Sequence, residues 1–254
     1  MSFIEDPLFY LIAVPAVLIV GIGKGGFAGG LGIVAVPLLA LVSSPIQAAG
    51  IMLPILCVMD VTGVKAWLTR WDRKLMARLW PPALIGIIVG ALTFRYVSET
   101  FLEILIGTLA LLFSLRYWLG GRIRLGLSLP DRPAGWLWSG MSGYTSFVAH
   151  AGGPPLMIYL LPKKLDKSVF VGTVTIYFAG VNYVKLIPYG LLGQLSAENL
   201  GTSLLLAPAA IIGVKLGVWM HDRVNAVLFN KLMYLFLFCA GLKLLWDGFS
   251  QVFA

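Results

Sequence analysis

Long apolar runs dominate the chain, and short connections that carry charge, proline or glycine separate them. Six runs have about 16 to 22 residues, close to the roughly 20 that cross a bilayer as a helix: residues 47–68, 79–94, 101–119, 169–188, 200–220 and 226–246. Four further runs form two pairs, each joined by a glycine-rich segment: residues 8–22 with 31–42, and residues 134–149 with 154–161. This pattern predicts an all-α polytopic membrane protein with eight to ten membrane segments.

Each pair of runs permits two topologies. The first pair has about 15 and 12 residues, roughly 22 and 18 Å of helix, whereas the hydrocarbon core is about 30 Å thick, so neither arm is expected to cross alone. Each pair is either one interrupted helix that crosses once or a hairpin that returns to its own side. Hairpins leave only Arg95 of the loop cations on one side and gather the rest on the other: Arg70, Arg73, Lys74, Arg78, Arg122, Arg124, Arg132, Lys163, Lys164, Lys167 and Arg223. The positive-inside rule therefore favours hairpins with both termini outside, although pairs of fully crossing helices would give the same parity.

An internal repeat supports the hairpins. A shift of 120 residues relates Gly23, Phe27, Gly32, Leu41, Val64 and Lys65 to Gly143, Phe147, Gly152, Leu161, Val184 and Lys185. After a longer loop, a shift of 127 relates Pro81, Ala83, Ile85, Gly86 and Gly90 to Pro208, Ala210, Ile212, Gly213 and Gly217. Each half, residues 1–127 and 128–254, would hold one broken or re-entrant hairpin and three spans. An odd number of crossings makes the two repeats inverted, an architecture common in secondary transporters.

Composition agrees with a membrane protein and excludes other classes. Hydrophobic residues make up 59% of the chain and charged residues 12%, against about 25% charged in soluble domains. The net charge of +8 lies in short connections, which suits cytoplasmic loops beside acidic lipid headgroups better than nucleic acid. Cys57 and Cys239 both lie in apolar runs, so neither a disulfide framework nor a metal site is expected.

The first glycine-rich segment, residues 21–32, carries one lysine within a membrane-spanning sequence. Gly21, Gly23 and Gly26 match G-x-G-x-x-G, but no strand precedes them, so a nucleotide loop is not predicted. Glycines leave backbone N–H groups free to bind an anion, and the alternative is close helix packing. A lysine at this depth costs about 2.5 to 3.5 kcal/mol, which favours a ligand contact. The candidate anion-binding residues here are Lys24, Gly25, Gly26, Gly29 and Gly30.

The second glycine-rich segment, residues 142–155, offers hydroxyl groups and an imidazole at the same depth. His150 can donate to an anion or exchange a proton, or it can be a neutral ring bonded to a carbonyl of the broken helix. Pro154 and Pro155 cannot continue the helical ladder, so they are expected to fix the break. The candidate binding residues of this segment are Ser146, His150, Gly152 and Gly153.

Four further polar residues lie inside apolar runs. Lys65 and Lys185 occupy equivalent positions in the repeat. Each is either a lysine that snorkels to the membrane surface or part of the transport pathway. Asp60 lies deeper and can pair with Lys24 or Lys65, or carry a coupling proton. Asn182, in the matching run of the other half, is a candidate polar contact.

Four segments of the chain resemble the sulfite exporter TauE/SafE family, also called the toluenesulfonate uptake permease family. They are GKGGFAGGLGIVAVPLLAL (23–41), SPIQAAGIMLPILCVMD (44–60), SGYTSFVAHAGGPPLMIYLLP (142–162) and FVGTVTIYFAGVNYVKLIPY (170–189). The resemblance implies a bacterial inner-membrane transporter of sulfur-containing anions such as sulfite, sulfoacetate or other organosulfonates. In such a membrane, the charge distribution places both termini in the periplasm. Where many members have a third consecutive glycine, this chain has Leu31 and Pro154, so we expect a binding loop of different shape.

We therefore expect a secondary transporter that binds a small anion and works by alternating access without ATP. An anion channel is the alternative, and a membrane-embedded enzyme is a weaker one, because no second catalytic group accompanies Lys24 and His150. The expected partners are the anionic substrate and the lipid bilayer, with no nucleic acid, cofactor or metal. Coupling to a proton or another ion, and assembly as a homodimer, are left open.

Overall fold

The computed structural model describes residues 3–27, 34–119, 129–221, 223 and 226–253, and within these the secondary structure is entirely helical. The helices follow the chain in this order: α1 (Pro7–Gly26), α2 (Ala35–Leu39), α3 (Pro45–Trp67), α4 (Arg73–Phe94), α5 (Glu99–Trp118), α6 (Asp131–Ala149), α7 (Gly153–Leu160), the 3₁₀ turn η2 (Leu161–Lys163), α8 (Lys167–Leu191), α9 (Ala197–Met220) and α10 (Ala226–Phe253). A long helix, a short helix and three long helices thus occur in the same order twice.

Side-chain caps explain where several helices begin. The hydroxyls of Ser44, Ser98 and Ser196 accept hydrogen bonds from backbone N–H groups in the first turns of α3, α5 and α9. The carboxylates of Asp72 and Asp166 do the same for α4 and α8. These caps satisfy N–H groups that have no partner within the helix, so the loops end where the sequence places Ser or Asp.

Among the described residues, six helices are long and apolar enough to cross a membrane: α1, α3, α4, α5, α8 and α9. The prediction that the first arm is too short to cross is wrong, because α1 continues through Lys24 to Gly26 and has 20 residues, or about 30 Å. The second glycine-rich segment does break the helix. His150 adopts a left-handed conformation at φ 51°, and α7 begins at Gly153.

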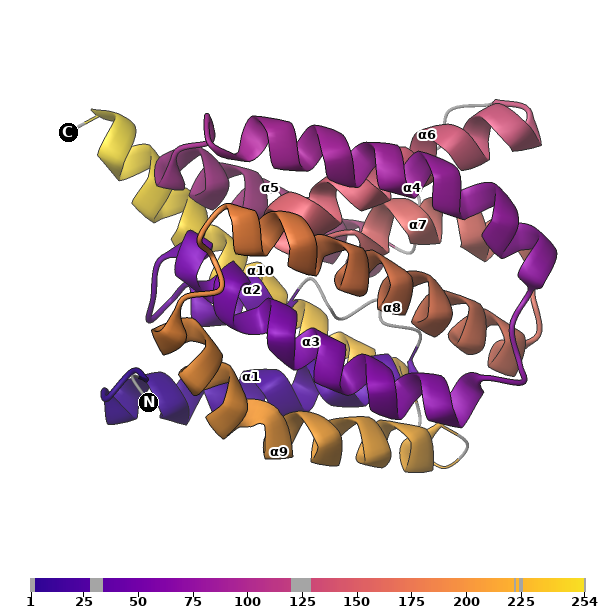
Figure 1. Cartoon of the computed structure of the whole chain (residues 1–254), viewed down its shortest axis with the longest axis horizontal. Coiled ribbons are helices and arrows are strands. Elements are labelled where there is room, and N and C mark those ends of the chain that lie inside the picture. The colour runs from indigo at the N-terminus through magenta and orange to yellow at the C-terminus, as the bar shows by residue number, and fades with distance from the viewer. Residues whose placement is uncertain (1–2, 28–33, 120–128, 222, 224–225, 254) are drawn as a thin grey trace.

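Six of the long helices form two layers, and the helices of one layer run in the opposite direction to those of the other (Figure 1). One layer holds α1, α3 and α9, and the other holds α4, α6 and α8. Each layer therefore combines helices from both halves of the sequence. α5 and α10 pack mainly on each other, where Tyr117 stacks on Tyr234 at 4.1 Å between ring centroids.

Glycines bring helices within each layer into backbone contact. In the first layer, a Cβ at Gly25 would overlap the carbonyl of Val214 in α9, and one at Gly26 would overlap that of Gly217. In the second layer, a Cβ at Gly143 of α6 would overlap the carbonyl of Ala83 in α4. Small residues allow this approach because they present no side chain at the contact, as in close helix pairs within membranes.

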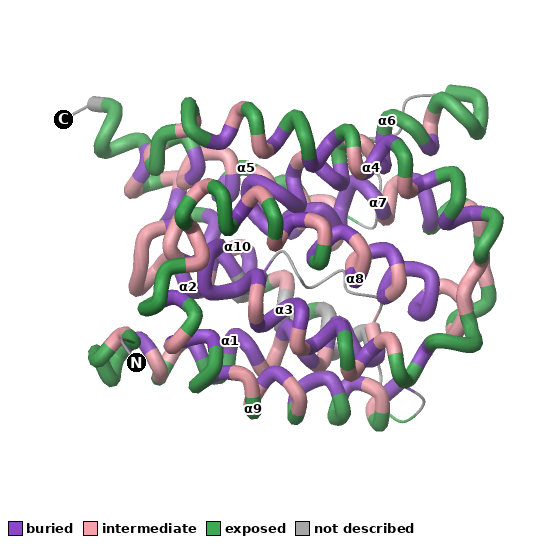
Figure 2. Tube along the Cα trace, viewed as in Figure 1, coloured by how far each residue is buried: buried purple, intermediate pink, exposed green. Residues whose placement is uncertain are grey.

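Whether a residue is buried depends on whether it faces another helix, and not on whether it is polar. Residues that face between helices are buried, and many outward positions are exposed (Figure 2). Large apolar side chains such as Leu92, Leu204 and Trp246 are more than half exposed. An outward apolar surface of this kind matches lipid contact, as the predicted membrane fold requires.

Candidate functional site

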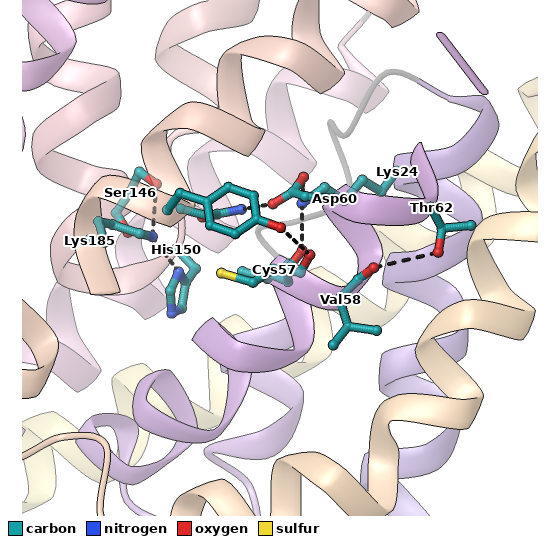
Figure 3. A network of polar contacts seen from close by, with 11 residues as sticks. Lys24, Cys57, Val58, Asp60, Thr62, Ser146, His150 and Lys185 are labelled. Carbon is teal, nitrogen blue, oxygen red and sulfur yellow. Dashed lines mark hydrogen bonds and ion pairs between the residues drawn. The ribbon is translucent and has the colours of Figure 1, made fainter. Parts of the chain in front are cut away.

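A buried ion pair joins α1 to α3. The ammonium Nζ of Lys24 lies 2.5 Å from Oδ1 of Asp60, and the Asp60 side chain is fully buried (Figure 3). Lys24 also donates to the backbone carbonyl of Leu56 at 3.4 Å. Lys24 lies in the last turn of α1, where a cation is favoured by the partial negative charge of the helix end. Of the two partners that the sequence left open for Asp60, the structure pairs it with Lys24.

Asn182 of α8 completes the coordination of the carboxylate. Its amide Nδ2 donates to Oδ2 of Asp60 at 2.8 Å. One helix from each half of the chain therefore contacts the same carboxylate. Buried charges in proteins are usually paired or hydrogen-bonded. Here Oδ1 of Asp60 forms the ion pair with Lys24, and Oδ2 accepts the hydrogen bond from Asn182.

Lys185 of α8 lies at the centre of a second buried polar cluster. Its Nζ is 2.8 Å from the carbonyl oxygen of Ser146, 3.2 Å from Oγ of Ser146 and 2.7 Å from Nδ1 of His150 (Figure 3). These three partners are electrically neutral. Lys185 thus differs from Lys24, because hydrogen bonds stabilise it without a carboxylate.

The hydrogen bonds of His150 define its tautomer. Nε2 lies 3.0 Å from the carbonyl oxygen of Ala49, which can only accept, so Nε2 carries the hydrogen. Nδ1 therefore accepts from Lys185. His150 is bonded to a carbonyl, as one of the two sequence interpretations proposed, but that carbonyl belongs to α3 and the second ring nitrogen contacts a lysine.

Side chains of α6 hold the break in the helix. Oγ of Ser142 donates to the carbonyl of Gly152 at 2.7 Å, and Oγ1 of Thr145 donates to the carbonyl of Ala151 at 3.1 Å. A Cβ at Gly152 would lie 2.6 Å from the carbonyl oxygen of Ser142, so only glycine allows this approach. These contacts place His150 against both α3 and α8.

A small cavity lies between the two clusters. Its volume is about 30 Å³, which is enough for about two water molecules. It is lined by Val20, Lys24, Leu56, Ser146, His150, Gly153, Val174, Thr175, Phe178 and Asn182. Its wall therefore combines polar groups from α1, α6 and α8 with an apolar face, the arrangement expected of a small-ligand site.

Thr175 is a lining residue that the sequence interpretation missed. Its side chain is buried, and its Oγ1 has no hydrogen-bond partner among the described residues. An unpartnered buried hydroxyl costs free energy unless a ligand or water bonds to it. A lone threonine in an apolar helix carries no sequence signal that separates it from other helical threonines.

The remaining predicted site residues lie elsewhere. Gly25 and Gly26 pack against α9, as the alternative interpretation of the glycines proposed. Lys65 is exposed on α3, so the structure does not bring it into the cavity. Gly29 and Gly30 lie outside the described residues.

Two aromatic side chains hold the end of α1 beside Lys24. Nε1 of Trp67 donates to the carbonyl of Gly25 at 2.9 Å, and Nδ1 of His221 lies 2.7 Å from the carbonyl oxygen of Gly26. The two rings also make an edge contact at 4.9 Å between centroids. They serve as partners for the Gly25 and Gly26 carbonyls, which a helix end leaves without hydrogen bonds. This explains how α1 continues past Ile22 through Gly23, Gly25 and Gly26.

The described residues hold no group of three or more His, Cys, Asp or Glu side chains suited to a metal ion. In the described part of the chain, helices that are long and apolar enough to cross a membrane enclose paired charges and a small cavity, which is the arrangement expected of a membrane transport protein. The chain belongs to the sulfite exporter TauE/SafE family, whose sequence profile matches residues 13–244. Searches of curated proteins and of solved structures gave no match.

Proposed function

We propose that the protein is a secondary transporter of a small sulfur-containing anion such as sulfite, sulfoacetate or another organosulfonate, and that it works by alternating access in a bacterial inner membrane. One observation carries the proposal: a cavity between the two halves of the chain is lined by Lys24, and Lys185 is bonded to two other lining residues, Ser146 and His150. Membership of the TauE/SafE family supports the class of substrate.

Each lining residue has a role in this proposal. Lys24 attracts the anion, and the Thr175 hydroxyl, which has no partner among the described residues, supplies a hydrogen bond to it. Asn182 and Ser146 offer an amide and a hydroxyl group. His150 holds Lys185 in place and exchanges protons with it. We expect none of these groups to form a covalent intermediate.

The architecture supports alternating access between two inverted repeats, residues 1–127 and 128–254. Each layer mixes helices from both halves, and the cavity lies where the layers meet. Rocking of one layer against the other would expose the cavity to each side in turn. We place the basic turns in the cytoplasm and both termini in the periplasm, because Lys and Arg favour the inner side.

Transport in proteoliposomes tests the proposal. Vesicles with the wild-type protein should accumulate labelled sulfite or sulfonate, and Lys24→Gln should abolish this uptake. Lys215→Gln is the matched control, because Lys215 is exposed on α9 and should leave uptake unchanged. Uptake that survives Lys24→Gln in folded protein would contradict the role of Lys24.

Counterflow separates a carrier from an anion channel. Unlabelled substrate inside the vesicle should accelerate entry of labelled substrate, because a carrier exchanges one for the other. A channel lacks this stimulation and would show saturable or linear flux alone. Product formation from the anion without any gradient would instead indicate an enzyme.

A further inference from the structure

Few ionisable side chains surround the cavity. Among the described residues, Lys24 and Asp60 form one pair, and Lys185 and His150 form the other. Cys57 and Tyr183 lie nearby, where the Tyr183 hydroxyl donates to the carbonyl of Cys57 at 3.4 Å. A thiol and a phenol are ordinarily uncharged near neutral pH, so they add no charge to the site.

Lys185 and His150 act as a single charged unit. Nδ1 of His150 lies 2.7 Å from Nζ of Lys185, and Nε2 of His150 donates to the carbonyl of Ala49. If both groups were protonated, two N–H donors would point at each other across this short distance. The pair therefore holds at most one positive charge.

Asp60 limits the positive charge that the site can supply. Lys24 carries one positive charge, the Lys185–His150 pair carries at most one, and Asp60 removes one while it is ionised. When the Lys185–His150 pair carries its one positive charge, a singly charged anion brings the net charge of the anion and these side chains to zero. A doubly charged anion leaves an excess negative charge in a buried environment, which is costly.

The position of Asp60 suits this role. Asp60 contacts the lining residues Lys24 and Asn182 but is itself fully buried and does not line the cavity. Its carboxylate is therefore fixed to the protein as a permanent counter-ion that an entering anion cannot replace. The lining also includes apolar side chains, among them Val174 and Phe178 of α8, which suit the carbon end of a small sulfonate.

We propose that Asp60 restricts the cavity to singly charged oxyanions. This inference rests on the proposed function and narrows its substrate class. Hydrogensulfite and simple alkylsulfonates fit, whereas sulfate, the sulfite dianion and sulfoacetate each bring a second negative charge. Asp60 is a specificity-determining residue that acts through Lys24 rather than by touching the anion.

Binding of methanesulfonate and sulfate to purified full-length protein tests the inference. Both ions present tetrahedral sulfur and differ by one unit of charge. Titration calorimetry and thermal shift should show that wild-type protein binds methanesulfonate about tenfold or more tightly than sulfate. Asp60→Asn should reverse or abolish this preference, mainly through an increase of about tenfold in sulfate affinity.

Two further variants control for charge. Lys24→Gln/Asp60→Asn removes one charge of each sign, so it should not gain the sulfate affinity of the single variant. Asp247→Asn removes a carboxylate that pairs with Lys243 at 2.5 Å on the surface, and it should leave the ratio of the two affinities unchanged. If Asp60→Asn does not fold, the wild-type ratio decides, because tighter binding of sulfate than of methanesulfonate contradicts the inference.

The inference and the proposed function fail in different ways. Wild-type protein that transports sulfonate and binds sulfate equally well refutes the role of Asp60 and leaves transport standing. An Asp60→Asn variant with an unchanged affinity ratio does the same. Vesicles that accumulate none of the sulfur-containing anions refute the proposed function itself.

Discussion

The ammonium of Lys185 lies 2.7 Å from Nδ1 of His150, and both side chains are buried. A buried lysine surrounded by neutral acceptors gains from an anion nearby, because the anion stabilises its charge. We predict that Lys185→Met lowers the affinity for methanesulfonate about tenfold or more, measured by titration calorimetry. A purely structural Lys185 would instead change the melting temperature and leave the affinity of the folded protein intact.

Burial should separate two ion pairs of equal length. Lys24–Asp60 and Lys163–Asp131 are both 2.5 Å long, but Asp60 is fully buried and the Asp131 side chain is 54% exposed. Lys24→Gln leaves a buried carboxylate without its cation and should cost about 3–5 kcal/mol of unfolding free energy. Lys163→Gln should cost about 0–1 kcal/mol, because water screens the exposed pair. Chemical unfolding in detergent measures both, and equal costs would contradict the burial argument.

Thr175 offers a test that separates binding from stability. Its hydroxyl has no partner among the described residues, so Thr175→Val should leave the melting temperature unchanged or raise it. The same change should lower anion affinity about tenfold, which corresponds to one lost hydrogen bond to a charged group. Thr62→Val is the control, because that hydroxyl donates within its own helix. An unchanged affinity in Thr175→Val would remove Thr175 from the site.

Glycines at the α1–α9 contact should not tolerate a methyl group. A Cβ at Gly26 would overlap the carbonyl of Gly217, so Gly26→Ala must push the two helices apart. We predict a loss of about 1–3 kcal/mol, seen as a lower melting temperature. Gly190→Ala in α8 is the control, since no atom lies within 4 Å of the added methyl group and alanine favours a helix. Equal melting temperatures for the two variants would contradict the contact.

Cysteine accessibility tests the orientation. Single cysteines at Glu5 and Glu198 should react with a membrane-impermeant reagent from outside the cell, whereas cysteines at Lys74 and Lys164 should react only after permeabilisation. All four positions are exposed; Glu5, Lys74 and Glu198 do not cap a helix, and Lys164 caps the 3₁₀ turn η2. Cys239→Ser removes the exposed native cysteine from the background. Labelling of a cysteine at position 74 in intact cells would contradict the proposed orientation.

Apolar runs in the sequence predicted the ends of most helices within a few residues. The α1 end is different, because glycine weakens an isolated helix and the sequence does not reveal that Trp67 and His221 would satisfy its carbonyls. Those partners are 42 and 195 residues away along the chain. Long-range contacts of this kind override local propensity.

Side-chain environment was harder to predict than position. Lys65 and Lys185 are equivalent in the repeat, yet Lys65 is exposed and Lys185 is fully buried. Their surroundings differ because α6 supplies Ser146 and His150 to Lys185, whereas the corresponding residues of the first half are Gly26 and Gly30. The match in sequence pairs the two lysines, but it does not pair the polar groups that surround them.

The glycine contacts also determine what can fold by itself. Gly25 and Gly26 seat α1 of the first half directly on α9 of the second, and Gly143 seats α6 on α4 in the same exchanged manner. A chain cut between residues 127 and 128 would leave α1 and α6 each with an uncovered, glycine-lined strip of backbone. Each half therefore supplies the helix that covers this strip in the other half. We expect the two halves to reach the native structure only when they are produced together.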